Sequence, residues 1–590
     1  MGFNHYFQSE LSALRQLGRR FAERNPALAP FLAHPGQDPD VERLLEGFAF
    51  LTGRLRQKLD DELPELTHSL MHLLWPNYMQ PLPSFSILQF DPLKRVGPPV
   101  QVPRDTSIES EGAGGQRCRF RTCYATDVMP LQLTGVESLR QGEGAHLDLR
   151  LAMSAEGNFS ELAFDALRLH LSGDRYTSQG LYLGLLQHLD AIHLLLLDHD
   201  GMPIDEIDGQ RAGLRLSAAN VRPVGFAENQ ALIPYPQNTF RGYRHLQEYF
   251  AFPDKYLFVD VEGLDVLHTL PEALLKRAHG MVMRFELRTQ RFEARHLTLD
   301  NVKLYCTPIV NLFKHDAVPI RLDGKQDEYL LVPGEYASGN AAVFSVDSVT
   351  GWRPGGLGYQ AYVPFESFVH DGQSTQSYII RQRVSLQHSG LDTWIGFGDH
   401  KGQHQETLSI ELTCTNSNLP RQLRIGDINQ PCEQAPELLT FRNITVPTSS
   451  FAPPLDQDFL WKLISNMSLN YLSLTDINAL KVILQTYDFP SYHDQQAHKV
   501  GQARLGALRS ISHEAVDRLH RGLPVRGLRV DLIVDPQGFL GQGDVFVFAS
   551  VLNEFFSLYA SLNSYHELRV TSTQGDVYLW PCRMGQQPLL

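Results

Sequence analysis

A few polar side chains stand at spacings that metal chemistry uses. His400 and His404 lie four residues apart, a spacing that lets two imidazoles on one helix face share a zinc ion. They belong to the segment Gly-Asp-His-Lys-Gly-Gln-His, whose glycines favour a loop. His493 and His498 are five apart, so they do not share a helix face. We therefore predict no metal and no cofactor at these histidines.

Two groups of carboxylates invite a calcium or acid–base interpretation. The run from Asp198 to Gly201 reads Asp-His-Asp-Gly, but the later oxygen ligands of a calcium loop are missing, which favours a polar turn. Asp60, Asp61 and Glu62 fall on the polar side of an amphipathic helix pattern. Acid–base catalysis needs carboxylates that are buried or paired in a cleft, so we interpret these three as a solvated face.

The familiar catalytic motifs are missing from the sequence. Gly324-Lys325 is followed by Gln326 and has no glycine at the required upstream spacing, so it is not a phosphate-binding loop. The chain has no His-Glu-x-x-His and no Gly-x-Ser-x-Gly. We predict no catalytic residue and a protein that is not an enzyme. Two carboxylates far apart in the sequence would escape this search, so a β-rich carbohydrate-active hydrolase stays open as the alternative.

Composition narrows the class of protein. The 590 residues include 43% hydrophobic and 20% charged side chains, an ordinary globular mix. The formal net charge of −14 repels phosphate backbones, so we expect no nucleic acid as partner. Arg117, Arg119 and Arg121 alternate with period two, which predicts the solvent face of one strand and not a basic patch.

Cysteines and apolar runs point to the cytoplasm. The six cysteines are scattered without a disulfide or metal spacing, so we expect reduced and mostly buried thiols. The N-terminus lacks the basic and apolar regions of a signal peptide. The most apolar stretch, from Leu181 to Leu197, is interrupted by polar residues and is too short to span a bilayer. We expect no direct membrane insertion.

The N-terminal pattern predicts two helices, the second of which carries a candidate interface. Asp38 is a suitable cap and Pro39 suits the first helical position. Apolar residues then recur at nearly heptad spacing. The candidate partner-interface residues are Leu44, Phe48, Leu51, Leu55 and Leu59. Periodicity does not identify what covers such a stripe, so the core of this chain and a partner helix are both left open.

The remaining patterns predict an α+β protein with a helical N-terminal segment, a β-rich multidomain middle and a mixed α/β C-terminal part. Short proline-bounded runs after residue 80 are typical of strands. Further expected elements are helices at 181–189, 243–250 and 459–467, a helix capped by Asp544 through 559, and strands at 191–197, 528–534 and 567–571. The expected domains are 1–80 (helical), 81–240 (β-rich with one helix), 241–447 (mainly β) and 448–590 (mixed α/β).

Nine segments carry a resemblance to a known family, in order along the chain: residues 39–51 with 58–66, 75–84, 243–255, 306–313, 344–351, 412–416, 463–474, 543–548 and 558–564. No single segment is specific, but nine collinear ones are. Together they resemble the TssF family of type VI secretion baseplate proteins.

The resemblance implies a structural wedge subunit of a contractile baseplate, similar to the wedge proteins of phage tails. It implies TssG-, TssK- and TssE-like partners, a second copy of the chain and a VgrG spike. It also implies a cytoplasmic baseplate docked at an inner-membrane complex and a role in assembly of the contractile sheath and tube. The resemblance brings no catalytic residues. A contractile phage-tail wedge protein is the second alternative, because the physics of the two is the same.

Overall fold

The computed structural model falls into two compact units, which are described separately. One unit comprises residues 1–76 with 455–460, and the other comprises 77–454 with 461–590. The expected domain boundaries near residues 240 and 447 stay a prediction. The structure describes residues 7–8, 11–12, 14–15, 39–41, 43–54, 71 and 76–585, the last range without 142–143, 205, 208–209, 212, 236–240, 289–296, 323–325, 338, 353–357, 366–375, 386–389, 398–405, 433–438, 454–475, 521–522, 561 and 563.

The described residues of the first unit are helical, as the apolar spacing predicts. A helix runs over residues 39–41 and 43–54, where the sequence places one after Asp38. Leu11, Ala49 and Met71 are buried. Asp60, Asp61 and Glu62 lie outside the described residues, as does the helix expected at 459–467.

The second unit begins with a six-stranded antiparallel sheet whose strands come from distant parts of the chain. Phe85 pairs with Val310, and Phe90 pairs with Phe441 on the other side of the same strand. The sheet order is β26 (Gln430–Pro431), β3 (Ser107–Ala113), β4 (Gln116–Thr122), β17 (Cys306–Val310), β1 (Phe85–Phe90) and β27 (Phe441–Asn443). A separate ribbon pairs β2 (Val100–Val102) with β5 (Thr126–Val128).

Strand β4 confirms the expected alternation. Cys118 and Phe120 face the core, whereas Arg117, Arg119 and Arg121 are exposed or half-buried. The exposed row is therefore the wet face of a strand and not an isolated basic patch, since Glu109 accepts from Arg117 and Arg119.

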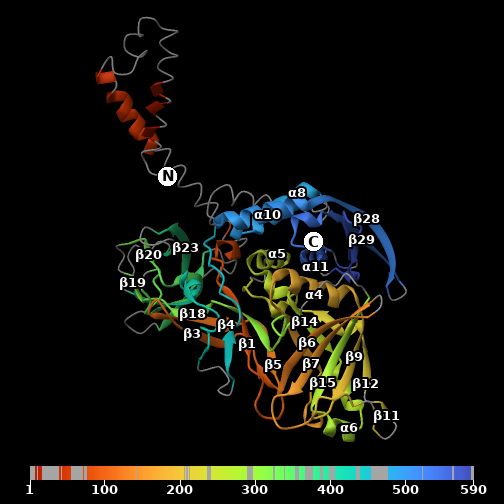
Figure 1. The fold of residues 1–590 in the computed structure, drawn as a ribbon. Helices are drawn as coiled ribbons and strands as arrows, with labels where there is room; N and C mark the ends of the chain where they lie inside the picture. The colour runs from red at the N-terminus through yellow and green to blue at the C-terminus, as the bar shows by residue number, and fades with distance from the viewer. Residues whose placement is uncertain are drawn as a thin grey trace. The chain divides into compact units, whose positions relative to one another are not determined.

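Two further sheets and one helix form the next layer (Figure 1). Asp198 accepts from the backbone of Asp200 and Met202, which makes the expected polar turn. One sheet has the order β12 (Gly213–Ser217), β9 (Leu189–Leu197), β15 (Gly280–Leu287), β7 (Gly144–Met153) and β6 (Leu131–Gln141). The other has the order β13 (Val221–Pro223), β14 (Phe258–Glu262), β8 (Ala166–Leu171) and β16 (Val302–Leu304), and a small hairpin joins β10 (Glu206–Ile207) to β11 (Gln210–Arg211).

Helix α4 (Arg175–Gln187) packs against β8 and β13 on one side and α11 (Gln542–Tyr559) on the other. The helix expected at 181–189 is present, but it begins six residues earlier than expected, at Arg175. The Asp174 side chain accepts from the Thr177 backbone and starts the helix earlier, through polar residues that carry no apolar stripe.

An eight-stranded sheet with its own hydrophobic core fills the region that the sequence predicts to be mainly β. Leu408, Ile410 and Ile395 are among its buried residues. All pairings are antiparallel except the short β22–β23 pair. The strands are β18 (Phe313–Asp316), β25 (Glu406–Thr415), β21 (Ala342–Trp352), β22 (Tyr359–Pro364), β23 (Ser377–Val384), β24 (Leu391–Phe397) and β20 (Glu328–Leu330), with β19 (Ile320–Leu322) on β25.

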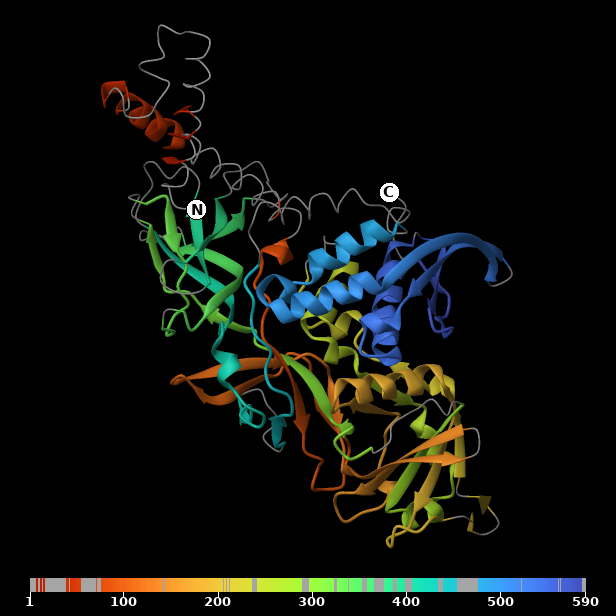
Figure 2. The same ribbon diagram turned by 45° about the horizontal axis from the view of Figure 1, so that its top comes forward.

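The C-terminal part covers the middle layer with helices and adds one more sheet (Figure 2). Strands β29 and β30 are parallel, and α11 connects them. The strands expected at 528–534 and 567–571 are confirmed. The helices are α8 (Ile477–Tyr487), α9 (Pro490–His493) and α10 (Gln495–Ala507), and the sheet order is β28 (Leu508–His520), β29 (Leu523–Val534), β30 (Tyr565–Ser572) and β31 (Val577–Leu579), with β32 (Arg583–Met584) on β30.

The prediction that Asp544 caps α11 is wrong. Gly541 is the residue before the helix, and Asp544 lies within its first turn. The Asp544 carboxylate still accepts from the backbone of Leu540, but it is buried and also binds Arg504. The sequence pattern identifies Asp544 as an acidic residue near the start of the helix. It does not show that the distant Arg504 forms an ion pair with this residue.

The centre of the second unit contains a fully buried ion pair between Glu248 and Lys255. Glu248 lies on α5 (Gly242–Ala251), the helix expected at 243–250, and Lys255 lies on the 3-10 turn Pro253–Tyr256 that follows. Glu248 Oε1 accepts from the backbone N–H of Leu232 at 2.8 Å and of Ile233 at 3.1 Å. The remaining carboxylate oxygen accepts from Lys255 Nζ.

Lys255 is satisfied in turn by groups from other parts of the chain. Its Nζ donates to the Gln230 carbonyl and lies 4.8 Å from the centre of the Tyr256 ring. Its backbone carbonyl accepts from the Tyr124 hydroxyl at 2.9 Å. Burial lowers the pKa of Lys255, and the Glu248 carboxylate opposes that shift. The pair therefore joins α5, the 230–233 loop and the chain after β4 at one point.

Removing one member of this pair is expected to destabilise the second unit strongly. Glu248→Gln keeps an oxygen for Leu232 and Ile233 but removes the counter-charge of Lys255, so the buried ammonium must stay unpaired or lose its proton, which costs about 3–5 kcal/mol. Lys255→Met leaves the opposite charge uncompensated and should cost a similar amount, whereas the double variant should recover part of the loss. Thermal unfolding of all three variants measures this.

Lys276→Met is the control. Lys276 pairs with Glu272, one turn away on the same helix, and both side chains are exposed, so this ion pair contributes little to stability. This change should leave the unfolding midpoint unaltered. Single variants as stable as the parent chain would contradict the central role of Glu248 and Lys255.

Candidate interaction surfaces

The predicted interface residues in the first unit lie on the solvent-exposed side of their helix. Leu44 is 73% exposed, Phe48 is 56% exposed and Leu51 is 63% exposed. The opposite side, which includes Ala49 and Gly53, is buried. The structure thus brings the three predicted side chains together at four- and three-residue spacing, and among the described residues of this unit they are exposed. Leu55 and Leu59 lie outside the described residues.

This distribution bears on the two explanations that the sequence leaves open. A stripe that filled the core of its own chain would be shielded from water, as Ala49 is. Three large apolar side chains on one exposed helix face are typical of a protein–protein contact. Contact with a partner through Leu44, Phe48 and Leu51 remains a proposal.

Four helices of the second unit meet at the Asp544 carboxylate. Asp544 on α11 accepts from Gln179 on α4 at 3.0 Å and from Arg504 on α10 at 3.1 Å. The Arg504 guanidinium also lies 5.4 Å from the ring centre of Tyr249 on α5. A side chain at Gly543 would meet the Gln179 backbone at 2.5 Å, so glycine permits the close approach of α4 and α11.

Buried tyrosines extend this helix contact to the start of the unit. The Tyr243 ring on α5 stacks on Tyr487 of α8 with centres 4.6 Å apart. Tyr78 packs on Tyr487 and its hydroxyl lies 3.1 Å from that of Tyr235. Burial raises the pKa of Tyr78 and of Tyr487 well above the ordinary value, so both stay neutral. The cluster therefore packs the helices together and supplies no charge.

Three asparagine and arginine contacts join the eight-stranded sheet to the six-stranded one. Asn311 Nδ2 donates to the Arg119 carbonyl at 2.6 Å and to Asn416 Oδ1 at 2.8 Å. Asn416 Oδ1 also accepts from the Arg119 backbone at 2.9 Å. Both asparagines are fully buried, and their mutual bonds fix the end of β25 against β4.

Two grooves in the second unit differ in the character of their walls. The larger, of about 870 Å³, lies where β3 and β4 meet β18, and its charged walls include Glu109 paired with Arg119 and Asp105 paired with Arg121. The smaller, of about 380 Å³, has apolar walls that include Phe546 and Trp580. Ion pairs within the chain account for Glu109, Arg119, Asp105 and Arg121, and the groove is also lined by Lys314.

The described histidines and cysteines do not form a metal centre. Across the described parts of the chain, no three His, Cys, Asp or Glu side chains are placed to hold a metal ion. His400 and His404 lie outside them, whereas His493 ends α9 and His498 lies in α10. Cys118, Cys123, Cys306 and Cys414 are buried, and all six cysteines are free thiols. No helix in the described ranges is both long and apolar enough to cross a membrane.

Sequence reasoning missed the residues that hold the second unit together. No sequence pattern singles out Glu248 and Lys255, and the pattern around Asp544 predicts only a helix cap, because their partners lie 7, 40 and more residues away in the sequence. The one signal within the sequence is their setting among aromatic residues, as in Tyr-Arg-His-Leu-Gln-Glu-Tyr-Phe from Tyr243. A charge inside an apolar helix must find a counter-charge or lose its own.

Comparison with known proteins gives the same family along the whole chain. Residues 1–587 match the family model described as type VI secretion system, TssF. The type VI secretion system component TssF1 of Pseudomonas aeruginosa is 30% identical, and the alignment covers 99% of each chain.

Two solved structures share the fold. A chain of the TssK-TssF-TssG baseplate subcomplex, determined by cryo-electron microscopy, superposes with a TM-score of 0.76 at 31% identity, covering 93% of this chain and 99% of that one. A chain of the baseplate complex from the type VI secretion system has a TM-score of 0.62 at 27% identity and full coverage of both. The hydrolase alternative receives no support from these matches. The chain belongs to the TssF family and is a structural component of the type VI secretion system baseplate.

Proposed function

We propose that this chain is a wedge subunit that holds TssG- and TssK-like proteins in the baseplate. The observation that carries the proposal is the exposed apolar stripe of Leu44, Phe48 and Leu51, on a chain similar to one in a TssK-TssF-TssG subcomplex. Each of these side chains contributes about 1.5–3 kcal/mol when fully buried. Leaving all three in water is costly, and a partner helix removes that cost.

The wider assembly follows from the same role. A second copy of the chain, a TssE-like subunit and a VgrG-like spike are the further partners that a wedge would contact while the contractile sheath and tube assemble. We place the baseplate in the cytoplasm, docked at the inner-membrane complex. The second unit supports this role as a rigid body, because Glu248, Lys255 and Asp544 bind their helices and loops through buried bonds.

The function requires no catalysis, and we propose that the chain has none. The purified chain is expected to bind no nucleotide and to hold no stoichiometric metal, because its sequence carries no phosphate-binding loop and the two arginines Arg119 and Arg121 of its larger groove are paired with Glu109 and Asp105. Calorimetry with ATP and elemental analysis measure these two properties. One zinc per chain that disappears in a His400→Ala and His404→Ala variant would contradict the metal prediction, and saturable nucleotide binding would contradict the other.

The stripe is tested by placing a charge in it. Leu51→Asp should abolish recovery of the TssG-like subunit in co-purification, because a carboxylate buried against an apolar partner would be desolvated without a counter-charge. The wild-type chain alone should self-associate through the same stripe.

The matched control is Leu579→Asp, which puts the same charge at a leucine that is 53% exposed in the second unit. Both variants must keep the helicity and melting behaviour of the parent chain. Undiminished capture of the TssG-like subunit by a folded Leu51→Asp chain would show that the stripe is not the interface.

A further inference from the structure

The C-terminal sheet ends in a long strand that has a neighbour on one side only. Strand β28 is thirteen residues long and pairs with β29 from Leu508 to His520. It is the first strand in the sheet order, and within the described residues no strand pairs with its outer side. Such an edge presents a row of backbone N–H and C=O groups that can pair with another strand.

Half of this hairpin extends past the rest of the sheet as a two-stranded arm (Figures 1 and 2). The third strand, β30, joins β29 only from Leu528 onward. Residues 523–527 of β29 therefore pair only with residues 516–520 of β28. A two-stranded ribbon in water is at best marginally stable, so an arm of this length is expected to gain order from a further strand.

The base of the arm is fixed to the body. The Tyr565 hydroxyl donates to the Val516 carbonyl at 2.7 Å. A side chain at Gly527 would lie 2.4 Å from the Tyr565 ring, so the glycine lets the ring pack directly on the ribbon. These contacts hold the start of the arm in one direction, which favours its use as a docking element.

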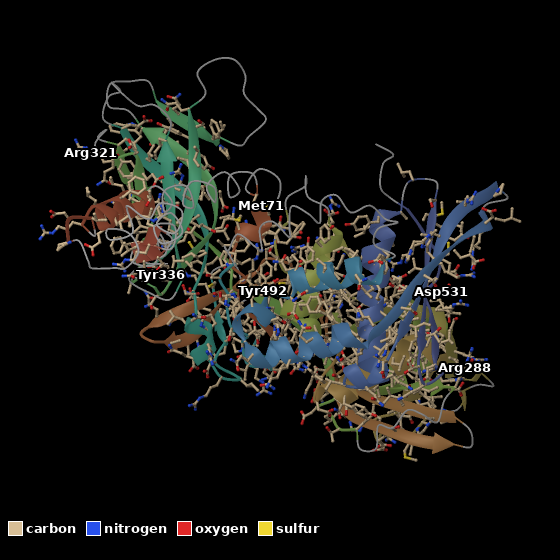
Figure 3. All side chains as sticks on the ribbon, turned by 90° about the horizontal axis from the view of Figure 1, so that it is seen from above. Met71, Arg288, Arg321, Tyr336, Tyr492 and Asp531 are labelled. Atoms are coloured by element: carbon tan, nitrogen blue, oxygen red, sulfur yellow. The ribbon has the colours of Figure 1, made fainter. Side chains whose placement is uncertain are left out.

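The two faces of the hairpin differ. One face pairs its charges with the body: Arg518 donates to Glu567 at 2.7 Å, and Asp531, labelled in Figure 3, accepts from Arg569. The other face continues the apolar side of the sheet, where Val530 is buried, out to Leu519, which is 79% exposed. Leu519 is the least covered leucine described in the second unit.

The side chains of β28 are complementary to a second copy of the same strand. In an antiparallel pair with two-fold symmetry about Ala515, Leu519 lies opposite the partner's Ile511. Asp517 then lies opposite the partner's His513, and Arg518 is diagonal to the partner's Glu514. Cross-strand pairs of these kinds stabilise an antiparallel sheet. Glu514 is available, since its one ion pair, with Arg529, is 3.9 Å long.

Neighbouring registers are worse. Symmetry about residue 514, 517 or 518 would place Glu514, Asp517 or Arg518 directly against its own copy, and like charges opposite one another destabilise the pair. Symmetry about Val516 would place Leu519 against His513 and lose the apolar contact. The register about Ala515 alone combines the apolar pair with both charge contacts.

We propose that β28 is a self-complementary edge through which two copies of this chain join their C-terminal sheets, antiparallel about Ala515. The occupant of the edge is thus a second copy. The inference rests on the proposed function in one respect, that the assembly contains more than one copy of the chain.

A cysteine at the symmetry centre tests the proposal. Ala515→Cys, in the full-length chain with Cys582→Ser and purified with its baseplate partners, should form a reducible species of twice the chain mass under mild oxidation. Directly opposite residues of an antiparallel pair have Cα atoms about 4.5–5.5 Å apart, a distance that a disulfide spans. Ser512→Cys is the control, because its own copy would lie roughly 20 Å away at about 3.4 Å per residue.

A second variant measures the apolar contact. In a Leu51→Asp background, which removes self-association through the stripe of the first unit, Leu519→Lys should weaken the remaining self-association by at least about tenfold in sedimentation, because each copy loses a buried leucine. Leu579→Lys, on the opposite edge strand β31, should leave it unchanged. Leu519 is exposed in the single chain, so the change should not affect folding.

The outcomes separate this inference from the proposed function. Cross-linking at Ala515→Cys but not at Ser512→Cys supports it. Three outcomes would overturn the β28 contact alone. They are equal cross-linking of both variants, cross-linking of Ala515→Cys to a different protein, and no cross-linking while the TssG-like subunit is still recovered. Loss of the TssG-like subunit from the parent chain would overturn the proposed function.

Discussion

Two opposite charges can leave water together only if every remaining donor and acceptor is satisfied, and Glu248 and Lys255 meet that condition. The carboxylate accepts from Leu232, Ile233 and Lys255, and the ammonium finds the Gln230 carbonyl and the Tyr256 ring. Together these bonds fix the position of α5 relative to the loop before it. Helix α5 then provides Tyr243 and Tyr249, on which α8, α10 and α11 are placed. The packing of the C-terminal helices therefore depends on the pair.

A rigid body of this kind suits a protein whose surfaces are its function. Asp544 joins α4, α10 and α11 by buried bonds, and Asn311 with Asn416 joins two sheets. These polar networks are largely enclosed, where a bond is worth most and an unpaired group costs most. Leu44, Phe48 and Leu51 in the first unit and Leu519 in the second are among the exposed apolar residues, and they lie outside the networks. In the proposed role, these are the side chains that partners would cover.

Local sequence patterns predict the elements well and their connections poorly. The helix around Phe48, the helix around Glu248 and the strands at 528–534 and 567–571 follow from apolar period alone. The early start of α4 does not follow from apolar period, because Asp174 caps a first turn made of polar residues. The six-stranded sheet is out of reach of such reasoning, because Phe90 pairs with Phe441 across most of the chain. The period of the apolar residues shows which side chains share a face of one element. Pairing between distant strands is decided by packing, which this period does not show.

The same limit applies to the surfaces. A heptad-like stripe identified Leu44, Phe48 and Leu51 as apolar neighbours, but only the structure shows that they are exposed. Nothing in the pattern of residues 508–520 shows an unpaired edge, since edge and central strands differ in their neighbours and not in their own period. Glu248 and Lys255 are seven positions apart in the sequence, on a helix and on the turn that follows it, and no periodicity encodes their pairing.

Hydrogen exchange of backbone amides, measured on the chain alone and in the assembled complex, tests the central claim most directly, that a rigid body offers separate apolar surfaces to its partners. The account predicts that amides of α5 and β14 around the Glu248–Lys255 pair exchange slowly and equally in both states. Amides in residues 43–54 and on the outer side of β28 should gain protection in the complex. Equal exchange at those two surfaces in both states, or protection of α5 that appears only on assembly, would contradict it.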